Sequence, residues 1–499
     1  MNHIVEQYQP VDIKLIISSF GPTEFYEEVH ALFKGPEGKL LNIPGFYNGK
    51  GEWIIRFSPV KVGIWNYETF SKRSELDRIC GTVECIENNN EAIHGGLLIN
   101  NEYPHHFIFE DGTSHFKQAY EADWLWALGL GDNKIIKVKE FISTIKKFGF
   151  NEIITNIYAH DTVWKKGKTC ANDYGPPALF LWEGDNEHPV HDRMNIEFFE
   201  NFDRLMYYLL EEGIIAHILI KVFNKEVNWP KEFSIQDDLF FKYIVARYQA
   251  FPNVIWDLGK EARVNINMSY KYNRLKMINA YDGYGRLLTV HDDPIFYSSK
   301  ESVKLVDFYT AQQHTEIHTR AIIQRQRENW PVFNAEYSYE HGPSGINDFT
   351  YSVCQTPEEV IHRTYEVVMA GAYPAYYYTY TAWDIIDYSY QPLGYLYMKI
   401  LNDFFTSISW WKFEPHDEYV NGEVRCLAIP DKDYIIYTGK VKKVRMRIRK
   451  PDIINAYWIN VFTGEKITHK EPVGIDIPSN SIEVKSPFED APAIFHLKV

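Results

Sequence analysis

Two glutamates, Glu261 and Glu336, follow short apolar runs in different parts of the sequence. Glu261 comes soon after the run at 253–258, which reads NVIWDL, and Glu336 ends the run at 331–336, which reads PVFNAE. Two carboxyl groups that face one cavity raise each other's affinity for a proton, so one can stay protonated while the other is ionised. A pair separated by about 5 Å can therefore divide into a proton donor and a nucleophile.

Other polar and aromatic side chains stand at the ends of similar apolar runs. The rings of Trp and Tyr can stack on the apolar faces of sugars, and their polar atoms can bind hydroxyl groups. Together with the two carboxyl groups they indicate a retaining glycoside hydrolase that needs no metal or other cofactor. Its expected partner is an oligosaccharide or glycoside. The predicted substrate contacts are Trp124, Asn156, Tyr158, His160, Lys260, His291, Tyr309, Gln313, His314, Tyr337 and Trp383.

The apolar runs alternate with helical patterns from about residue 116 onward. Thr356-Pro357, with Glu359 after it, is a typical helix start, since Thr caps the helix and Pro suits its first turn. We count eight strand and helix units before residue 409, and this number predicts a (β/α)8 TIM barrel. In such a barrel the reactive groups lie at the carboxyl ends of the strands, and strands four and seven face each other across the mouth. Glu261 and Glu336 follow these two strands.

Both ends of the chain show a different pattern. Val11, Ile13 and Leu15 alternate with polar residues near the N-terminus, and Val444 and Met446 do so near the C-terminus. A period of two residues is typical of strands with one buried face. We therefore predict a multidomain chain with an N-terminal β-sandwich at 1–105, the barrel at 106–409 and a C-terminal antiparallel β-sandwich at 410–499.

Particular phrases of the sequence resemble known families. NVIWDLGKEA at 253–262 and PVFNAEY at 331–337 resemble the strand-four and strand-seven motifs of the large clan of (β/α)8 retaining glycoside hydrolases. The whole chain is similar to bacterial proteins with a DUF5060 sandwich, a DUF4038-like barrel and a DUF5605-type β domain. EWIIRFSPVKVGIWNYET at 52–69 carries the first likeness, and GRLLTVHDD at 285–293 is among the phrases that carry the second. The resemblance implies that Glu261 is the acid/base and Glu336 the nucleophile.

Lys260 departs from the clan's pattern, in which an Asn before the acid/base binds the sugar 2-hydroxyl. A lysine donates hydrogen bonds but accepts none. Lys260 could contact an acidic sugar, pair with a carboxylate, or mark a substrate that differs at C2. It could also mark a non-catalytic carbohydrate-binding barrel, which is the alternative interpretation of the chain. A metal-dependent hydrolase or lyase is the third.

Composition narrows the function classes further. The 499 residues carry a net charge of −15, and 16% of them are aromatic, so the chain is globular and poorly suited to bind nucleic acid. Its five cysteines form no CxxC motif, which disfavours a zinc ribbon or disulfide scaffold. The N-terminus lacks the pattern of a signal peptide, and we find no membrane span. We expect a cytoplasmic enzyme, with homo-oligomerisation left open.

Overall fold

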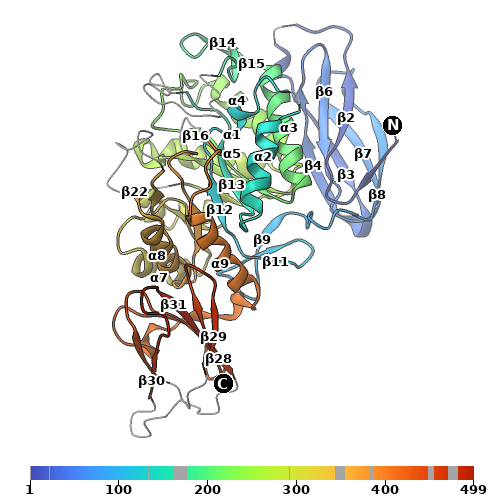
Figure 1. Cartoon of the computed structure of the whole chain (residues 1–499). Coiled ribbons are helices and arrows are strands. Elements are labelled where there is room, and N and C mark those ends of the chain that lie inside the picture. The colour runs from blue at the N-terminus through green and yellow to red at the C-terminus, as the bar shows by residue number, and fades with distance from the viewer. Residues whose placement is uncertain are drawn as a thin grey trace.

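The computed structural model of the chain describes residues 2–21, 23–132, 134–160, 177–291, 293–342, 354–381, 386–447, 455–469 and 481–499. Three parts follow one another along the chain: β-sheets at the N-terminus, a central barrel surrounded by helices, and β-sheets at the C-terminus (Figure 1). The TIM barrel with flanking β domains that the sequence predicts is therefore present. The exact boundaries at 105/106 and 409/410 remain our proposal.

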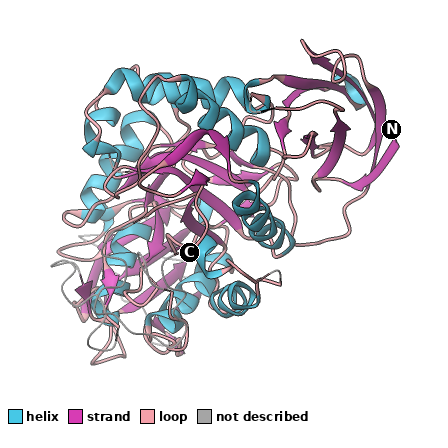
Figure 2. Ribbon diagram, turned by 90° about the horizontal axis from the view of Figure 1, so that it is seen from above, coloured by secondary structure: helices cyan, strands magenta, loops and turns pink. Residues whose placement is uncertain are grey.

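The barrel is built from eight strands that pair in parallel (Figure 2). In chain order they are β12 (Ala119–Glu121), β13 (Glu152–Asn156), β16 (Ile215–Val222), β17 (Val254–Lys260), β18 (Leu288–Thr289), β19 (Tyr309–Ala311), β20 (Val332–Asn334) and β23 (Tyr373–Tyr376). The sheet order is β18-β17-β16-β13-β12-β23-β20-β19, so β12 joins the first half of the barrel to the second. Between β18 and β19, the Asp307 amide donates to the Leu288 carbonyl at 2.8 Å, and Thr289 Oγ1 lies 2.8 Å from Thr310 Oγ1.

Helices cover the outside of these strands (Figure 2). They are α1 (Leu125–Leu128), α2 (Ile136–Lys146), α3 (Ile196–Glu211), α4 (Ile235–Tyr248), α5 (Met268–Tyr281), α6 (Pro294–Tyr297), α7 (Ile317–Glu328), α8 (Pro357–Val368) and α9 (Gly394–Thr406). The expected start of α8 is confirmed, because Thr356 accepts a hydrogen bond from the Glu359 amide and Pro357 occupies the first turn. Asn195 and Ser234 cap α3 and α4 in the same way.

The N-terminal part contains two main sheets that share one hydrophobic core. One sheet has the order β1 (Asn2–Glu6), β8 (Cys80–Ile86), β7 (Gly63–Ser71), β3 (Val29–Lys34) and β4 (Leu40–Pro44). The other has the order β2 (Val11–Ile16), β6 (Glu52–Phe57) and β5 (Phe46–Tyr47). Ile13 and Leu15 are buried in this core, as their alternation predicts. The sequence expects a β-sandwich here, and that finer arrangement stays a prediction.

A buried charge cluster ties the N-terminal part to the barrel. Asp203 on α3 receives hydrogen bonds from Arg247 on α4 at 2.8 and 2.9 Å and from Arg56 on β6 at 3.0 Å. Arg56 also pairs with Asp12. Since the two arginines are almost completely buried, their charges need these carboxylates.

The C-terminal part also has two sheets around one core. The larger has the order β24 (Glu414–Pro415), β25 (Arg425–Ile429), β26 (Asp433–Tyr437), β31 (Ala493–Lys498), β28 (Asn455–Asn460) and β29 (Lys466–Thr468). The smaller pairs β27 (Lys443–Arg447) with β30 (Ser481–Lys485). On β27, Val444 and Met446 are buried whereas Arg445 and Arg447 are exposed, which confirms the period of two and a solvated basic face.

Candidate active site

A cavity of about 240 Å³ opens where the barrel strands end. Both glutamates singled out in the sequence, Glu261 and Glu336, line it. The last residue of β13 and the chain segments that follow β12, β16, β17, β19 and β20 contribute to its wall. The lining residues are Asp123, Trp124, Asn156, Val222, Asn224, Lys225, Lys260, Glu261, Arg263, Gln312, His314, Glu336 and Tyr339.

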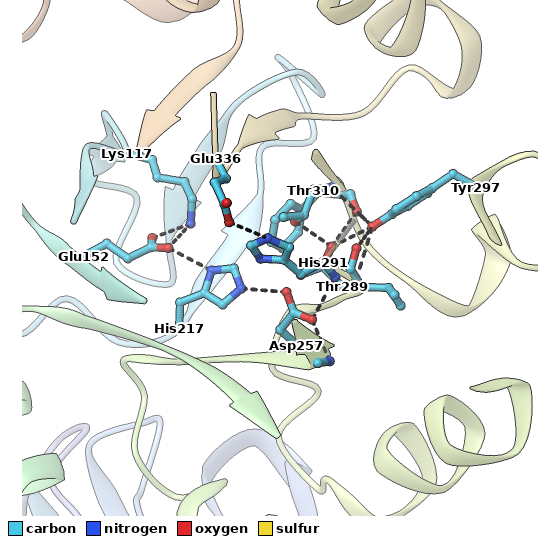
Figure 3. A network of polar contacts seen from close by, with 12 residues as sticks. Lys117, Glu152, His217, Asp257, Thr289, His291, Tyr297, Thr310 and Glu336 are labelled. Carbon is cyan, nitrogen blue, oxygen red and sulfur yellow. Dashed lines mark hydrogen bonds and ion pairs between the residues drawn. The ribbon is translucent and has the colours of Figure 1, made fainter. Parts of the chain in front are cut away.

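The Glu336 carboxylate is buried among groups that favour its ionised form. Gln312 Nε2 donates to Glu336 Oε1 at 2.7 Å, and Lys260 Nζ lies 3.5 Å from Oε2. His291 Nε2 lies 3.8 Å from the same oxygen (Figure 3). Burial alone would raise the pKa of Glu336, but Lys260 and His291 outweigh it and lower the pKa to about 2. Glu336 is therefore a carboxylate at neutral pH, as a nucleophile must be.

The end of β17 has an irregular backbone that brings Glu261 to the cavity. A Cβ atom at Gly259 would lie 2.5 Å from the Lys221 carbonyl oxygen, so only glycine fits against β16 here. Glu261 itself has φ +56°, in the left-handed region that residues other than glycine seldom adopt. Such strain is concentrated at functional sites. Arg263 Nη2 lies 2.9 Å from Glu261 Oε2.

Lys260 is surrounded by carboxyl groups. Its Nζ donates to Glu121, to Asp123 Oδ2 at 3.0 Å and to the Tyr377 hydroxyl at 3.0 Å. These interactions, together with Glu336, hold the pKa of Lys260 well above its usual range although the side chain is buried. The pKa of Glu121 is also well above its usual range. Burial is the main cause and the negative charges of Asp123 and Glu336 add to it, whereas the positive charge of Lys260 lowers the pKa without outweighing them. Of the possibilities that the sequence leaves open for Lys260, the ion pair with carboxylates is the one observed.

A second set of charges lies inside the barrel beneath Glu336 (Figure 3). His217 bridges two carboxylates, with Nδ1 3.0 Å from Glu152 Oε1 and Nε2 3.1 Å from Asp257 Oδ2. Lys117 also pairs with Glu152. Asp257 Oδ1 accepts a hydrogen bond from the His291 amide at 2.9 Å and from the Gly259 amide at 2.9 Å. The interior network thus fixes the backbone on which His291, Lys260 and Glu261 are carried.

The structure brings four of the eleven predicted substrate contacts to this cavity. Trp124, Asn156, Lys260 and His314 line its wall with the two glutamates. His291 does not line the cavity, but it lies directly behind Glu336. His160 is half-buried with its ring 6.3 Å from that of Phe180, and it is absent from the lining. Trp383 lies outside the described residues.

The structure places four predicted contacts elsewhere. Tyr309 and Gln313 line a separate cavity between β19, β20 and α7, because alternate residues of β19 point to opposite sides of the sheet. The Tyr337 hydroxyl bonds to Thr364 on α8 at 2.7 Å. Tyr158 is buried against Trp126 and Phe198 outside the cavity lining. For these four positions the prediction is corrected.

Six polar or aromatic lining residues were absent from the predicted contacts: Asp123, Asn224, Lys225, Arg263, Gln312 and Tyr339. Two of them could have been found by the period of two along a strand. Asp123 lies two residues after Glu121, which contacts Lys260, so the two side chains are expected on the same face of the strand. In the same way, Gln312 lies two residues after Thr310, which contacts Thr289. Arg263 and Lys225 lie in loops, where no period applies.

Within the described residues, no group of three or more His, Cys, Asp or Glu side chains is arranged to hold a metal ion. Among the helices that the structure describes, none is long and apolar enough to span a membrane.

Comparisons with known proteins identify the family of the barrel and a similar fold. The family described as "Apiosidase-like, catalytic domain" matches residues 102–412, and DUF5060 matches residues 4–72. No curated protein matches the chain. A solved structure from Bacteroides vulgatus, provisionally assigned as a glycoside hydrolase, covers 100% of both chains at 18% identity with a TM-score of 0.80.

A second structure from the same organism, described as a family 5 glycoside hydrolase, is 15% identical with a TM-score of 0.62. It covers 81% of this chain and 94% of its own. At these identities the two structures support the fold alone. The family match spans more than half of the chain and includes the whole barrel with its cavity. The chain therefore belongs to the apiosidase-like catalytic domain family, carries a DUF5060 domain in front of its barrel, and is a glycoside hydrolase.

Proposed function

We propose that the chain is a retaining glycoside hydrolase that removes terminal sugars from oligosaccharides or glycosides. The observation that carries the proposal is that Glu336, with Gln312 Nε2 2.7 Å and Lys260 Nζ 3.5 Å from its carboxylate oxygens, lines the same cavity as Glu261. A volume of about 240 Å³ is below the roughly 300 Å³ at which drug-sized pockets begin. The cavity thus suits one sugar unit better than a long stretch of polymer.

In the first step, a Glu336 oxygen attacks the anomeric carbon while Glu261 gives its proton to the departing glycosidic oxygen. The C–O bond to the leaving group breaks, and a glycosyl ester forms on Glu336. In the second step, the Glu261 carboxylate takes a proton from water, and the water oxygen attacks the anomeric carbon. The ester bond breaks, Glu336 is again a carboxylate, and Glu261 is again protonated.

Two neighbouring side chains, Gln312 and Lys260, act on the Glu336 carboxylate. Gln312 and Lys260 hold Glu336 in one orientation and keep it ionised before the attack. Lys260 cannot accept the 2-hydroxyl bond that the clan's Asn accepts, and its charge is shared among Glu121, Asp123 and Glu336. We assign Lys260 to positioning and charge balance at the nucleophile.

A panel of aryl glycosides tests the proposal, with apiosides included because of the family's description. Glu336→Gln should abolish turnover, and a 2-fluoro glycoside should label wild-type Glu336 as shown by peptide mass spectrometry. Glu340→Gln is the matched control, because Glu340 is equally buried but bonds to Tyr376 and the start of α9 instead of lining the cavity. Full activity of the Glu336 variant would refute the mechanism.

The alternative that the sequence left open, a non-catalytic carbohydrate-binding barrel, makes a different prediction for the same panel. It predicts that sugars bind, that no glycoside in the panel is hydrolysed, and that no adduct forms on Glu336. The two candidates therefore separate in the same experiment.

A further inference from the structure

Two buried polar atoms at the cavity wall, Asp123 Oδ1 and Asn156 Nδ2, have no hydrogen-bond partner among the residues that the structure describes. Asp123 is 1% exposed and Asn156 is fully buried, and both residues line the cavity. A buried polar atom without a partner is costly, so native structures rarely keep one without a reason. One reason is a ligand that supplies the missing bond.

The two side chains are held in fixed orientations by their other polar atoms. Asp123 Oδ2 accepts hydrogen bonds from Lys260 Nζ at 3.0 Å and from the Tyr377 hydroxyl at 2.8 Å. Asn156 Oδ1 accepts one from the indole Nε1 of Trp126 at 2.9 Å. Because an indole N–H can only donate, the amide of Asn156 must present its oxygen to Trp126. Asp123 Oδ1 therefore remains as an acceptor for a ligand, and Asn156 Nδ2 remains as a donor.

The acceptor and the donor belong to neighbouring chain segments. Asp123 follows β12 and Asn156 ends β13, and the backbone amide of Asn156 donates to the backbone carbonyl of Asp123 at 3.0 Å. Because the two residues are neighbours across β12 and β13 and both line the cavity, an acceptor and a donor from them match two adjacent hydroxyl groups of a sugar ring, since a hydroxyl can both donate and accept.

The charge around Asp123 bears on the kind of sugar. Asp123 shares Lys260 with Glu121 and Glu336, so three carboxyl groups surround one ammonium. A substrate carboxylate placed at Asp123 would meet like charge in a buried setting, where repulsion is strong.

We propose that Asp123 and Asn156 are specificity-determining residues that bind two adjacent hydroxyl groups of a neutral sugar unit. This assignment rests on the proposed function and names the substrate class of the same cavity. Asp123 accepts from one hydroxyl and Asn156 donates to the next. A site built to bind a hydroxyl rejects an analogue that lacks it far more strongly than an apolar pocket rejects a missing methylene.

The test begins with wild-type protein and the para-nitrophenyl glycoside that it hydrolyses fastest. Each monodeoxy analogue of that glycoside is then assayed, together with its uronate counterpart. Removal of either of two adjacent hydroxyls should lower kcat/KM by about 100-fold or more, and the uronate should not be cleaved. Because the wild-type fold is untouched, these comparisons do not depend on any variant.

Variants then connect each hydroxyl to a side chain. Asp123→Asn should lower kcat/KM for the parent roughly 10- to 100-fold, but should cause little further loss for one of the two deoxy analogues. Asn156→Ala should behave in the same way with the other analogue. Gln313→Ala is the control, because Gln313 lines the separate cavity. If kcat/KM of the wild type falls only a few-fold, and equally, for every deoxy analogue, the assignment is overturned. Efficient cleavage of the uronate by the wild type would overturn it as well.

If no glycoside is hydrolysed and no adduct forms on Glu336, the proposed function fails while the recognition pair can still be tested. Calorimetric titration of wild-type and Asp123→Asn protein with neutral monosaccharides then tests whether the pair binds sugar. Binding to the wild type that the variant loses supports the pair, and absence of sugar binding to the wild type refutes it.

Discussion

The ammonium nitrogen of Lys260 lies 3.5 Å from Oε2 of Glu336, and both side chains are almost completely buried. The two residues come from β17 and from the segment after β20, on different sides of the barrel. Their contact explains how a carboxylate can remain ionised where burial alone would favour its neutral form.

Lys260→Met should therefore impair Glu336, the proposed nucleophile, in a pH-dependent way. Without the ammonium, the pKa of Glu336 rises from about 2, so activity will be lost as pH falls through the higher value. We expect kcat to drop by about 10- to 100-fold at neutral pH, with the acid limb of the kcat/KM profile moved upward. Lys260→Arg keeps the charge and should retain the wild-type acid limb. An unchanged acid limb in Lys260→Met would argue against the role of Lys260, provided circular dichroism shows a folded protein.

The neighbouring residues Gln312 and Gln313 allow a matched comparison. Gln312→Ala removes the 2.7 Å hydrogen bond to Glu336, and a bond to a charged group is worth about 1.5–3 kcal/mol. We expect kcat/KM to fall roughly 10- to 100-fold. Gln313→Ala should leave activity near the wild-type level, because Gln313 lines the other cavity. Equal losses in both variants would mean that the loop, and not the hydrogen bond, is responsible.

Gly259→Ala should disturb the end of β17 without removing any polar contact of a side chain. The added Cβ would lie 2.5 Å from the Lys221 carbonyl oxygen, so the backbone that carries Lys260 and Glu261 must shift. A displacement of about 1 Å at a reacting group can cost about 100-fold in rate, and we expect a loss of that order in kcat. Gly21→Ala is the control, since no atom of the described residues lies within 4 Å of the position that its new methyl group would occupy. Wild-type kcat for Gly259→Ala would show that the close approach does not matter for catalysis.

Glu340 should make the stability of the protein depend on pH. Burial raises the pKa of this carboxyl from 4.5 to about 7, against the bonds from Tyr376 and the Gly394 amide. A raised pKa in the folded state means that its stabilising effect is complete below about pH 4.5 and is lost as pH rises towards 7. The free energy of unfolding should fall by up to about 3 kcal/mol over this window.

The Glu340→Gln variant has no ionisable side chain at this position, so its free energy of unfolding should change less between about pH 4.5 and pH 7. Urea unfolding at pH 5 and pH 8 measures the difference, and Glu301→Gln, which changes an exposed side chain, serves as the control. A profile in Glu340→Gln that matches the wild type would show that Glu340 does not titrate in this range.

Local patterns predicted a large part of the fold. The start of α8 at Thr356-Pro357 and the buried alternation of Val444 and Met446 depend on neighbouring residues alone, and both are observed. The same reasoning placed Glu261 and Glu336 at strand ends, and both line one cavity. It did not choose correctly between Gln312 and Gln313, although the period along β19 separates them.

By itself, the sequence determined the order of strands and helices, and with it the strand ends at which Glu261 and Glu336 lie. These features follow from periods of two and 3.6 residues, which are local properties of the chain. Only the tertiary structure decided what those residues contact. Three of the partners of Lys260, namely Glu121, Asp123 and Tyr377, lie more than a hundred residues away in sequence. Closure of the barrel makes them neighbours, and the buried ammonium of Lys260, where the clan has Asn, lies against the Glu336 carboxylate.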